Sequence, residues 1–509
     1  MQTLEVPAPL ARARAHAHLI AVVDRAGSCT YAELLAGAER LAALLLAGRP
    51  DLAEARVVLL TSPTHAFVVG QWATWVAGGV VVPLSPAQPP AEWHYVGEDC
   101  QASLAIVAPE FADAFAPVAQ ALGIRMLPPL APHAPFDQTN GVAARPPAWP
   151  PVTRDRRALI LYTSGTTSRP KGVVLTHGNL VAQVECLTDA WAWTEDDRAL
   201  HVLPLNHTHG LINVLGCALW SGAVCEMAPA LDPAAIWDRF ASGDLTLFMA
   251  VPTIYRRLVA AWHEAPPDLQ RRWAAGAAAM RLFVSGSAAL PVSLLDQWRD
   301  ITGHTLLERY GMTEIGMALS NPLHGVRRPG WVGIPLPGVD VRVVDESGED
   351  VAGGTPGELL VRSAGVFREY WRRPDATAAA FAEGGWFRTG DVAACEDGAF
   401  RILGRLSVDI IKTGGEKVSA LEVEAVLRDH PDIADCAVVG LPDPEWGECV
   451  AAVVALRGQA TLTLSGLRDW ARARLSGPKL PRRLLMVPAL PRNAMGKVVK
   501  PELIRLFEG

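Results

Sequence analysis

Residues 161–179 read LYTSGTTSRPKGVVLTHGN and combine hydroxyl, glycine and cationic side chains in one short loop. Small residues let backbone N–H groups approach an anion closely, and the hydroxyls add further donors. This chemistry suits a polyphosphate. It differs from a Walker A loop, because Lys171 precedes Gly172 and no Gly-Lys-Ser/Thr triplet opens a helix. A Gly/Ser/Thr run on its own is also typical of an ordinary surface turn.

A second group of reactive side chains lies at residues 307–314, LERYGMTE. A carboxylate beside a phosphate site repels the ligand unless a cation bridges the two, and Mg²⁺ supplies such a bridge. Glu314 is therefore a candidate magnesium ligand. The alternative is a solvated glutamate at the end of a strand.

Three further strings carry candidate groups: Asp391 closes GWFRTGD, Lys497 closes PRNAMGK, and Gly414 and Gly415 lie in IKTGGEK. An aspartate between short strands can accept hydrogen bonds from both ribose hydroxyls. Paired glycines in a β context indicate close backbone approach. Taken by itself, a lysine in a polar loop is a solvated surface group.

The histidines of the string NHTHG (206–210) raise the question of a metal site. Two histidines without a third nearby ligand are weak support for one, and a buried, hydrogen-bonded histidine is the commoner case.

Taken together, these strings closely resemble the signatures of the acyl-adenylate-forming superfamily, which contains acyl-CoA synthetases, luciferases and peptide-synthetase adenylation domains. The resemblance covers essentially the whole chain. Ser168 and Ala289 depart from the family pattern, which usually has glycine and proline there. LERYGMTE, SGSAALP, GVFREYW, GRLSVDIIKTGGEKVSALEVE and PRNAMGK most resemble malonyl-CoA and methylmalonyl-CoA synthetases.

The resemblance implies that ATP, Mg²⁺ and coenzyme A are used, and it assigns roles residue by residue. Lys497, Thr313, Glu314 and His207 are the expected catalytic residues, and Thr166 and Glu314 the expected magnesium ligands. The expected nucleotide-binding residues are Thr163, Ser164, Gly165, Thr166, Thr167, Lys171, Ser287, Ala288, Glu308, Tyr310, Gly311, Asp391 and Arg405.

The acyl and coenzyme A sites follow from the same resemblance. Lys412, Gly414 and Gly415 are expected at the coenzyme A tunnel, and Ser407 at a hinge. His207, Arg309, Met312 and Arg281 are expected around the acyl group.

Arg309 indicates the acyl substrate. A monocarboxylate gives an acyl pocket no reason to hold a guanidinium, because a buried unpaired charge costs several kcal/mol. Malonate or methylmalonate supplies a second carboxylate, which arginine can bind through two parallel hydrogen bonds. The alternative is that Arg309 pairs with Glu308 or another acid and only braces the loop, and Arg281 is the second candidate.

The sequence thus predicts an ATP-dependent carboxylate–CoA ligase that forms an acyl-adenylate and then a thioester. Other readings are an acyl-CoA synthetase for a monocarboxylic acid, an adenylation enzyme that loads a carrier protein, a P-loop ATPase or kinase, and a silent nucleotide-binding module. The joint presence of Lys497, Glu314 and Asp391 disfavours the last.

The elements that must position these residues follow from hydrophobic periodicity. Short β-branched runs at 56–60, 79–83 and 103–107 alternate with helical stretches at 31–46 and 65–77, which predicts parallel sheets covered by helices. From residue 332, Gly/Pro turns separate the short strands 339–344, 357–361 and 400–403, as in a small β-barrel-like subdomain.

After Arg405 the pattern predicts strands at 408–411, 434–439, 450–456 and 483–487 and helices at 420–430 and 463–475. The expected fold class is α/β. A large N-terminal domain, residues 1–404, precedes a smaller α+β lid domain, residues 405–509.

Composition narrows the class of protein. The chain has 509 residues, 19% of them charged, and a net charge of −7 without a long Lys/Arg run, so neither nucleic acid nor an anionic membrane is expected as a partner. Eight scattered cysteines without a Cys-x-x-Cys pair favour reduced thiols. The start is a poor secretory signal and no run of about 18 apolar residues occurs, so a cytoplasmic location is expected. The alternative is a mitochondrial presequence, for which the early start of the functional sequence leaves little room. The oligomeric state is left open.

Overall fold

The computed structural model describes residues 3–4, 7–127, 148–163, 170–228, 230–458, 460–492 and 498–507. Ser164, Gly165, Thr166 and Thr167 of the phosphate loop, and Lys497, lie outside these ranges. Their roles therefore stay predictions.

A seven-stranded sheet carries both sides of the phosphate loop. Its order is β20-β10-β9-β5-β4-β6-β7, and the strands from β9 to β7 are parallel to their neighbours. β9 and β10 pair antiparallel, with Thr163 opposite Lys171, so residues 164–169 connect two adjacent strands. The bounds are β4 Arg56–Leu60, β5 Val80–Pro83, β6 Leu104–Val107, β7 Arg125–Leu127, β9 Arg157–Thr163, β10 Lys171–Thr176 and β20 Glu369–Tyr370.

A nine-stranded sheet carries the LERYGMTE segment. Its order is β17-β16-β15-β14-β13-β11-β12-β2-β3, parallel from β15 to β2 and antiparallel at both edges. The bounds are β2 Ile20–Asp24, β3 Gly27–Thr30, β11 Arg198–His201, β12 Val224–Met227, β13 Leu247–Ala250, β14 Leu282–Ser285, β15 Leu307–Met312, β16 Gly316–Ser320 and β17 Ile334–Pro335.

Two five-stranded sheets follow. The first is antiparallel and contains β18 Val339–Val344, β19 Gly357–Ser363, β21 Phe381–Ala382, β22 Trp386–Glu396 and β23 Ala399–Arg405. The second contains β24 Ile410–Thr413, β25 Glu416–Ser419, β26 Ile433–Asp443, β27 Gly447–Leu456 and β28 Arg483–Met486. A short pair, β1 Thr3–Leu4 and β8 Val152–Thr153, completes the strands of the described residues.

Helices pack on these sheets, and two of them begin at clear capping signals. Thr30 and Thr176 each accept a hydrogen bond from the backbone N–H three residues on, whose side chain returns one. The helices are α1 Ala8–Ala15, α2 Tyr31–Leu46, α3 His65–Val76, α4 Pro90–Asp99, α5 Pro109–Leu122, α6 His177–Ala190, α7 Cys217–Ser221, α8 Pro233–Phe240, α9 Pro252–Glu264, α10 Pro267–Ala279, α11 Val292–Thr302, α12 Pro374–Ala379, α13 Ala420–Leu427, α14 Leu464–Ala471 and α15 Lys500–Arg505. A π-helix, η1 His209–Gly216, precedes α7, and short 3₁₀ turns occupy η2 Glu383–Gly385 and η3 Gly477–Lys479.

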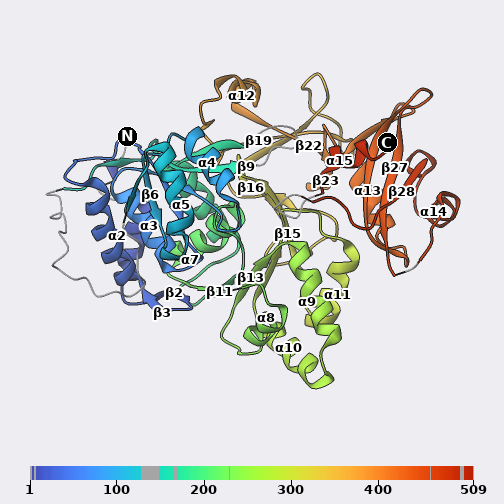
Figure 1. Ribbon diagram of the computed structural model, residues 1–509. Coiled ribbons are helices and arrows are strands. Elements are labelled where there is room, and N and C mark those ends of the chain that lie inside the picture. The colour runs from blue at the N-terminus through green and yellow to red at the C-terminus, as the bar shows by residue number, and fades with distance from the viewer. Residues whose placement is uncertain are drawn as a thin grey trace.

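The two parallel sheets share one large hydrophobic core, whereas the strands after residue 409 have apolar clusters of their own. Figure 1 shows these last strands, orange to red, on one side of the molecule, next to β22 and β23. Both five-stranded sheets thus lie at the carboxyl side of the chain, as the sequence pattern predicts.

The predicted α/β class and most predicted elements are confirmed. The runs at 31–46, 56–60 and 339–344 form α2, β4 and β18 with those bounds. Two expectations need correction. Asp391 lies inside the long strand β22 rather than between short strands. β24 begins at Ile410 rather than Val408, because the N–H groups of Val408 and Asp409 bond to the Arg405 carbonyl and form a turn first.

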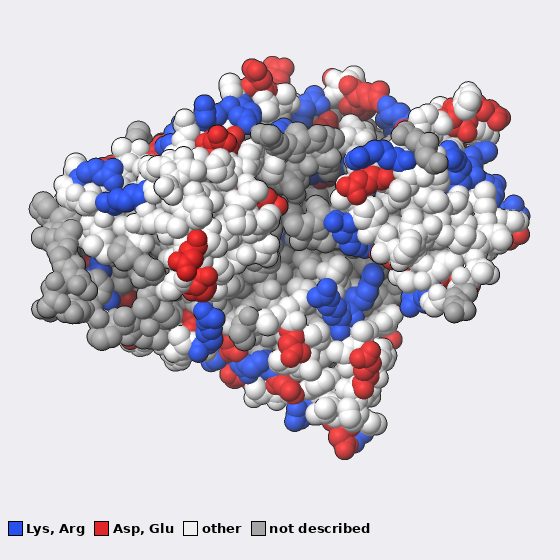
Figure 2. All heavy atoms as spheres, in the orientation of Figure 1, with Lys and Arg blue, Asp and Glu red and all other residues white. Residues whose placement is uncertain are grey.

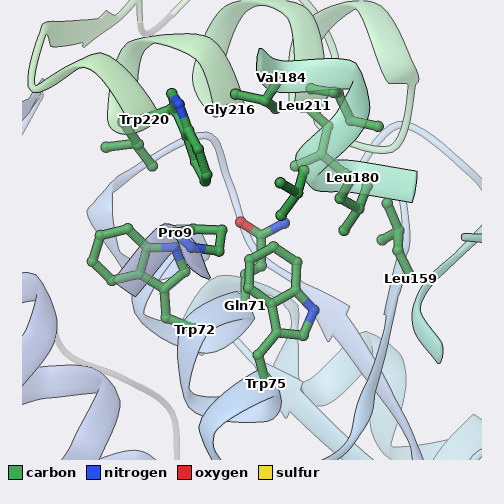
Figure 3. Close-up of a pocket in the computed structure, with 13 residues that line it drawn as sticks. Pro9, Gln71, Trp72, Trp75, Leu159, Leu180, Val184, Leu211, Gly216 and Trp220 are labelled. Atoms are coloured by element: carbon green, nitrogen blue, oxygen red, sulfur yellow. The ribbon is translucent and has the colours of Figure 1, made fainter. Parts of the chain in front are cut away.

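An apolar cavity of about 40 Å³ lies between α3, α6 and α7 (Figure 3). Trp72, Trp75 and Trp220 line it, and the Gln71 carboxamide points into it. This volume has room for a few water molecules but not for a nucleotide or an acyl chain. We therefore assign it to packing between the helices rather than to the active site.

All eight cysteines are free thiols, six of them buried, as expected for reduced protein. In the part of the chain that the structure describes, no helix is both long and apolar enough to cross a bilayer.

Candidate active site

The end of β15 brings several predicted site residues to one edge of the nine-stranded sheet. β15 is parallel to β14, with Glu308 opposite Ser285. Because the carboxyl ends of parallel strands meet at the same edge, the segment after Ser285 lies beside Arg309 and Tyr310. Ser287 is exposed and has a φ of +68°, which costs a residue other than glycine about 1–3 kcal/mol. The neighbouring Ala288 is also exposed.

Tyr310, Asp391 and Arg405 form one connected group. Tyr310 Oη donates a hydrogen bond to Asp391 Oδ2 at 2.5 Å, and Arg405 Nε lies 3.0 Å from Asp391 Oδ1. Arg405 Nη1 also donates to the Thr389 carbonyl at 2.6 Å. Burial, followed by the charge of Asp391, raises the pKa of Tyr310 well above its usual value, so the phenol is a neutral donor. The group offers a ring for stacking, a carboxylate for hydroxyls and a guanidinium for phosphate.

Glu314 and Lys171 lie on either side of Tyr370. Tyr370 Oη donates to Glu314 Oε1 at 3.0 Å, and Lys171 Nζ lies 5.3 Å from the centroid of the Tyr370 ring. Glu314 is only 6% exposed, and burial raises its pKa. No lysine or arginine of the described chain pairs with this carboxylate. Tyr370 lies in the string GVFREYW but is not among the site residues that the sequence predicts.

Arg309 is a buried cation without a counter-charge. It is 3% exposed, and its Nε and Nη2 atoms have no hydrogen-bond partner. A Cβ atom at Gly286 would lie 2.5 Å from Arg309 Cζ, so only glycine leaves room for the guanidinium there. Burial lowers the pKa of Arg309 to about 9, which leaves it charged at neutral pH. The expected alternative, an ion pair with Glu308, does not form in the described structure.

His209 is the histidine that lies next to Arg309. Its Nδ1 atom is 3.3 Å from Ser287 Oγ, and its buried Nε2 atom has no partner. Burial, followed by the charge of Arg309, lowers the pKa of His209 well below the usual value, so the imidazole is neutral. His207, the predicted residue, is partly buried two positions earlier. His209 is not among the predicted acyl-site residues, because nothing in the string NHTHG distinguishes the two histidines.

Glu308 is buried and hydrogen-bonded to backbone. It is 7% exposed and its Oε2 accepts a hydrogen bond from the Gly330 N–H at 3.2 Å. Burial raises its pKa to about 8. This hydrogen bond lets Glu308 brace the loop before Trp331, and its contact with the nucleotide stays a prediction.

Arg281 does not join the acyl-site residues. Its Nε and Nη2 atoms donate to the two oxygens of Asp197 at 2.7 and 2.6 Å, and its Nη1 donates to the Trp191 carbonyl at 2.9 Å. It precedes β14, whereas Gly286 follows that strand. At about 3.3 Å per residue, the five steps from Arg281 to Gly286 span roughly 16 Å. Arg281 is therefore a structural cation at the opposite end of the sheet.

Three more predicted site residues lie at the end of β15 and in the turn that follows it. Gly311, Met312 and Thr313 are partly buried there. The backbone at Gly311 needs glycine, because a Cβ would lie 2.1 Å from the Gly316 carbonyl oxygen. The turn therefore holds Thr313 next to Glu314 in a fixed geometry.

The glycine pair of the last sheet separates into a covered and an open position. A Cβ at Gly414 would lie 2.6 Å from the Trp446 ring, whereas nothing lies within 4 Å of one at Gly415. Both glycines have a positive φ, +57° and +82°. The Lys412 N–H donates to Glu448 Oε2 at 2.6 Å, which fixes the adjacent strand. Gly415 is thus the position where added bulk would reach free space.

The expected hinge residue Ser407 is exposed between β23 and β24. Two residues later, Asp409 accepts a hydrogen bond from the Arg405 N–H at 2.9 Å and pairs with Lys500 Nζ at 2.5 Å. Figure 2 shows that the molecule is hollowed between the C-terminal strands and the remaining chain, with lysine and arginine side chains on both sides. Charges from the two parts of the chain act on each other, because burial and then the charge of Arg428, at the end of α13, lower the pKa of Arg256 on α9.

Comparison with known proteins places this site in a family. The model of the AMP-binding enzyme family matches residues 10–371, and that of the AMP-binding enzyme C-terminal domain matches residues 422–497. The mitochondrial malonate–CoA ligase ACSF3 of Mus musculus is 47% identical over 525 residues, which cover 97% of this chain and 89% of the relative.

Solved structures agree. ATP-bound MatB from Rhodopseudomonas palustris is 36% identical, with a TM-score of 0.88 and 99% of each chain covered. O-succinylbenzoate coenzyme A synthetase from Bacillus subtilis, in complex with ATP and magnesium, is 25% identical with a TM-score of 0.82, and 99% of each chain is covered. The chain belongs to the AMP-binding enzyme family.

Proposed function

We propose that the protein is an ATP-dependent malonate–CoA ligase that forms malonyl-adenylate and then malonyl-CoA. The family, the identity with the malonate–CoA ligase of Mus musculus and the ATP-bound structural relative support this activity. Methylmalonate, which differs by one methyl group, is the second substrate that the same charge pattern accepts.

The observation that carries the malonate assignment is the unpaired guanidinium of Arg309. A buried charge without a partner is costly, and a protein retains one where a ligand completes the pair. The distal carboxylate of malonate supplies that partner. Arginine binds a carboxylate through two parallel hydrogen bonds, and the free Nε and Nη2 atoms are the two donors. His209, neutral and with a free Nε2, adds a third polar atom at the same place.

The chemistry has two steps. A carboxylate is a poor electrophile, because its carbon is electron-rich and its oxygen is a poor leaving group. One carboxylate oxygen of malonate attacks the α-phosphorus of ATP and expels pyrophosphate. The thiol of coenzyme A then attacks the acyl carbon, AMP leaves, and the thiol proton is released.

In this proposal, different described residues contact the base, the ribose and the phosphates of the nucleotide. Tyr310 stacks on adenine, Asp391 accepts the ribose hydroxyls, and Arg405 and Lys171 face the phosphates. Ser287 and Ala288 present backbone to the base, and Thr313 contacts the α-phosphate. The predicted loop residues 164–167 and Lys497 belong to the same proposal, which assigns to Lys497 the stabilisation of charge on the α-phosphate and the attacking carboxylate.

Mg²⁺ fits the donor set around Glu314. Magnesium binds through one or two carboxylates together with phosphate oxygens and keeps several waters. Glu314 provides a buried carboxylate that is oriented by Tyr370 and has no lysine or arginine partner among the described residues. When bound, Mg²⁺ neutralises the phosphate charge that Glu314 would otherwise repel.

For the second step we propose that residues 405–509 form a lid domain that turns about Ser407. Its glycine pair then faces the pantetheine arm of coenzyme A, with Lys412 and the open Gly415 at the tunnel. Binding energy is used to reorganise the site between the two half-reactions.

The decisive experiment supplies ATP and magnesium with malonate, methylmalonate, acetate, propionate or octanoate, with and without coenzyme A. We expect AMP and pyrophosphate, fastest with the diacids, and a thioester only when coenzyme A is present. If the products are ADP and phosphate instead, the protein is an ATPase or a kinase and does not adenylate its substrate. A faster reaction with octanoate would make the enzyme an acyl-CoA synthetase for monocarboxylic acids. Acylation of a carrier protein in preference to coenzyme A would identify an adenylation enzyme.

A further inference from the structure

Tyr370 is fixed in place by three independent contacts. Its backbone N–H donates to Thr377 Oγ1 at 3.0 Å. The Phe367 ring meets its ring edge-on, with centroids 4.7 Å apart. β20 pairs antiparallel with β10, with Tyr370 opposite Val173. The phenol therefore has one orientation, set by the seven-stranded sheet.

The strand register explains why the ring meets Lys171. Lys171 lies two residues before Val173 on β10, on the same face of that strand. Diagonal neighbours across an antiparallel pair are about 7–8 Å apart at the backbone, within reach of long and aromatic side chains. The ammonium accordingly lies 5.3 Å from the ring centroid, in the range of a cation–π contact.

The other end of the phenol meets Glu314 from a different sheet. The hydroxyl donates to Glu314 Oε1 at 3.0 Å, and the Phe367 N–H donates to the Glu314 carbonyl at 2.7 Å. The segment at β20 is thereby bonded to Glu314 through both side chain and backbone. One residue thus contacts a cation from the phosphate-loop strand and a carboxylate from the β15–β16 turn.

We propose that Tyr370 is a positioning residue that keeps Lys171 and Glu314 apart and ready for a magnesium–nucleotide complex. Opposite charges of this kind form a direct ion pair when nothing intervenes, and such a pair would cancel the charge that each offers to the ligand. The phenol binds both partners and is itself neutral. Its hydroxyl leaves the second oxygen of Glu314 for a metal ion, and its ring leaves the ammonium protons for phosphate oxygens. This inference rests on the proposed function.

The two halves of Tyr370 can be removed separately. Tyr370→Phe keeps the ring and deletes the hydroxyl, whereas Tyr370→Leu deletes both. Tyr162 offers a matched control, because its hydroxyl also donates to a carboxylate, Asp99 Oδ2, at 2.7 Å. Tyr162 precedes Thr163 on β9, so the two side chains point to opposite faces of the sheet. Tyr162→Phe therefore removes the same kind of bond away from the site.

The readout is binding rather than turnover. Calorimetry measures the dissociation constant of α,β-methylene-ATP, which cannot lose pyrophosphate, with and without magnesium, and thermal unfolding without nucleotide measures stability. We expect Tyr370→Phe to weaken binding about tenfold with magnesium and less than twofold without it. That size is typical for one hydrogen bond to a charged group. Tyr370→Leu should weaken binding under both conditions.

Equal weakening by Tyr162→Phe, or an unchanged magnesium dependence in Tyr370→Phe, would overturn the proposal and leave Tyr370 as a brace between sheets. Failure of the wild-type protein to bind magnesium and the analogue would instead refute the proposed function.

Discussion

The two ends of the nine-stranded sheet hold the same residue type in opposite circumstances. At one end Arg281 donates hydrogen bonds to both oxygens of Asp197 and to a backbone carbonyl. At the other end Arg309 is more deeply buried, yet two of its donor atoms have no partner. Folding alone explains the first arginine. The second is explained by a ligand, because an unpaired buried cation lowers the stability of the empty protein.

Glu308, next to Arg309 on β15, shows a third way in which the fold holds a buried ionisable group. It is nearly as buried as Arg309, but a raised pKa lets it take up a proton and become neutral. A buried ionisable group can therefore be paired, neutralised, or left charged without a partner. Only the charged group without a partner needs a substrate to balance it. The predictions below test this division, from the largest expected effect to the smallest.

Arg309→Leu should abolish the preference for a diacid. The value of kcat/KM for malonate should fall about 10²–10³-fold, the range for removing one partner of a buried charge pair. Binding of ATP should be unchanged, and the empty protein should unfold at the same or a higher temperature because an unpaired charge is gone. A lower unfolding temperature would show that Arg309 has a structural partner after all.

Arg281→Leu should do the reverse. It leaves Asp197 buried and unpaired and should cost about 3 kcal/mol of stability, at the lower end of the range because Arg281 is itself partly exposed. Thermal unfolding measures the loss, and the folded fraction should retain the malonate preference of the wild type. In Arg281→Leu combined with Asp197→Leu much of the stability should return. Loss of substrate preference in the single variant would place Arg281 in the acyl site.

Glu308→Gln should flatten the dependence of stability on pH. The folded-state pKa of about 8 lies above the value in the unfolded chain. The stabilisation from the bound proton is therefore complete at low pH and is lost as the pH rises through 8. Between pH 6 and 9 the wild type should lose about 2.7 kcal/mol more than the variant. If the free energies of unfolding of the two proteins changed equally with pH, Glu308 would be ionised in the folded protein over this whole range.

Arg309→Lys separates charge from geometry. Lysine keeps the positive charge but cannot form two parallel hydrogen bonds with one carboxylate. We expect kcat/KM for malonate to fall by about ten- to thirtyfold, between wild type and Arg309→Leu. Steady-state pyrophosphate release provides the value. A loss as large as that of Arg309→Leu would show that geometry rather than charge decides.

The glycine pair repeats the contrast between a filled and an open position. Gly415→Leu should slow thioester formation roughly tenfold, the effect of about 1.4 kcal/mol, while ATP–pyrophosphate exchange continues. Gly415→Asn is the control, because asparagine tolerates a positive φ and adds less bulk. If pyrophosphate exchange fails first in Gly415→Leu, the glycine serves folding.

Hydrophobic periodicity predicted α2, β4 and β18 to the residue, because each is an apolar-rich segment bounded by cap or turn residues. It could not place Asp391 inside β22, since Gly390 reads as a turn although it lies in a strand with a φ of +68°. Nor could it distinguish Arg281 from Arg309, since pairing depends on Asp197, which is 84 residues away from Arg281. Tyr370 was not predicted for the same reason, because its two partners, Lys171 and Glu314, lie far from it in the sequence.

Family resemblance supplied most site residues, but it did not indicate which of them are paired. The division between residues 1–404 and 405–509, the cytoplasmic location and the roles of Lys497 and the phosphate loop stay predictions. The relative from Mus musculus carries a mitochondrial name, so location needs its own experiment.

The most direct test of the account compares malonate with monomethyl malonate in wild-type protein, by pyrophosphate release with ATP and magnesium. The two acids have nearly the same shape near the reacting carboxylate, but the ester lacks the second charge. If the guanidinium of Arg309 waits for a carboxylate, kcat/KM should favour malonate by at least about 10²-fold. Equal values, or a preference for the ester, would contradict the central claim.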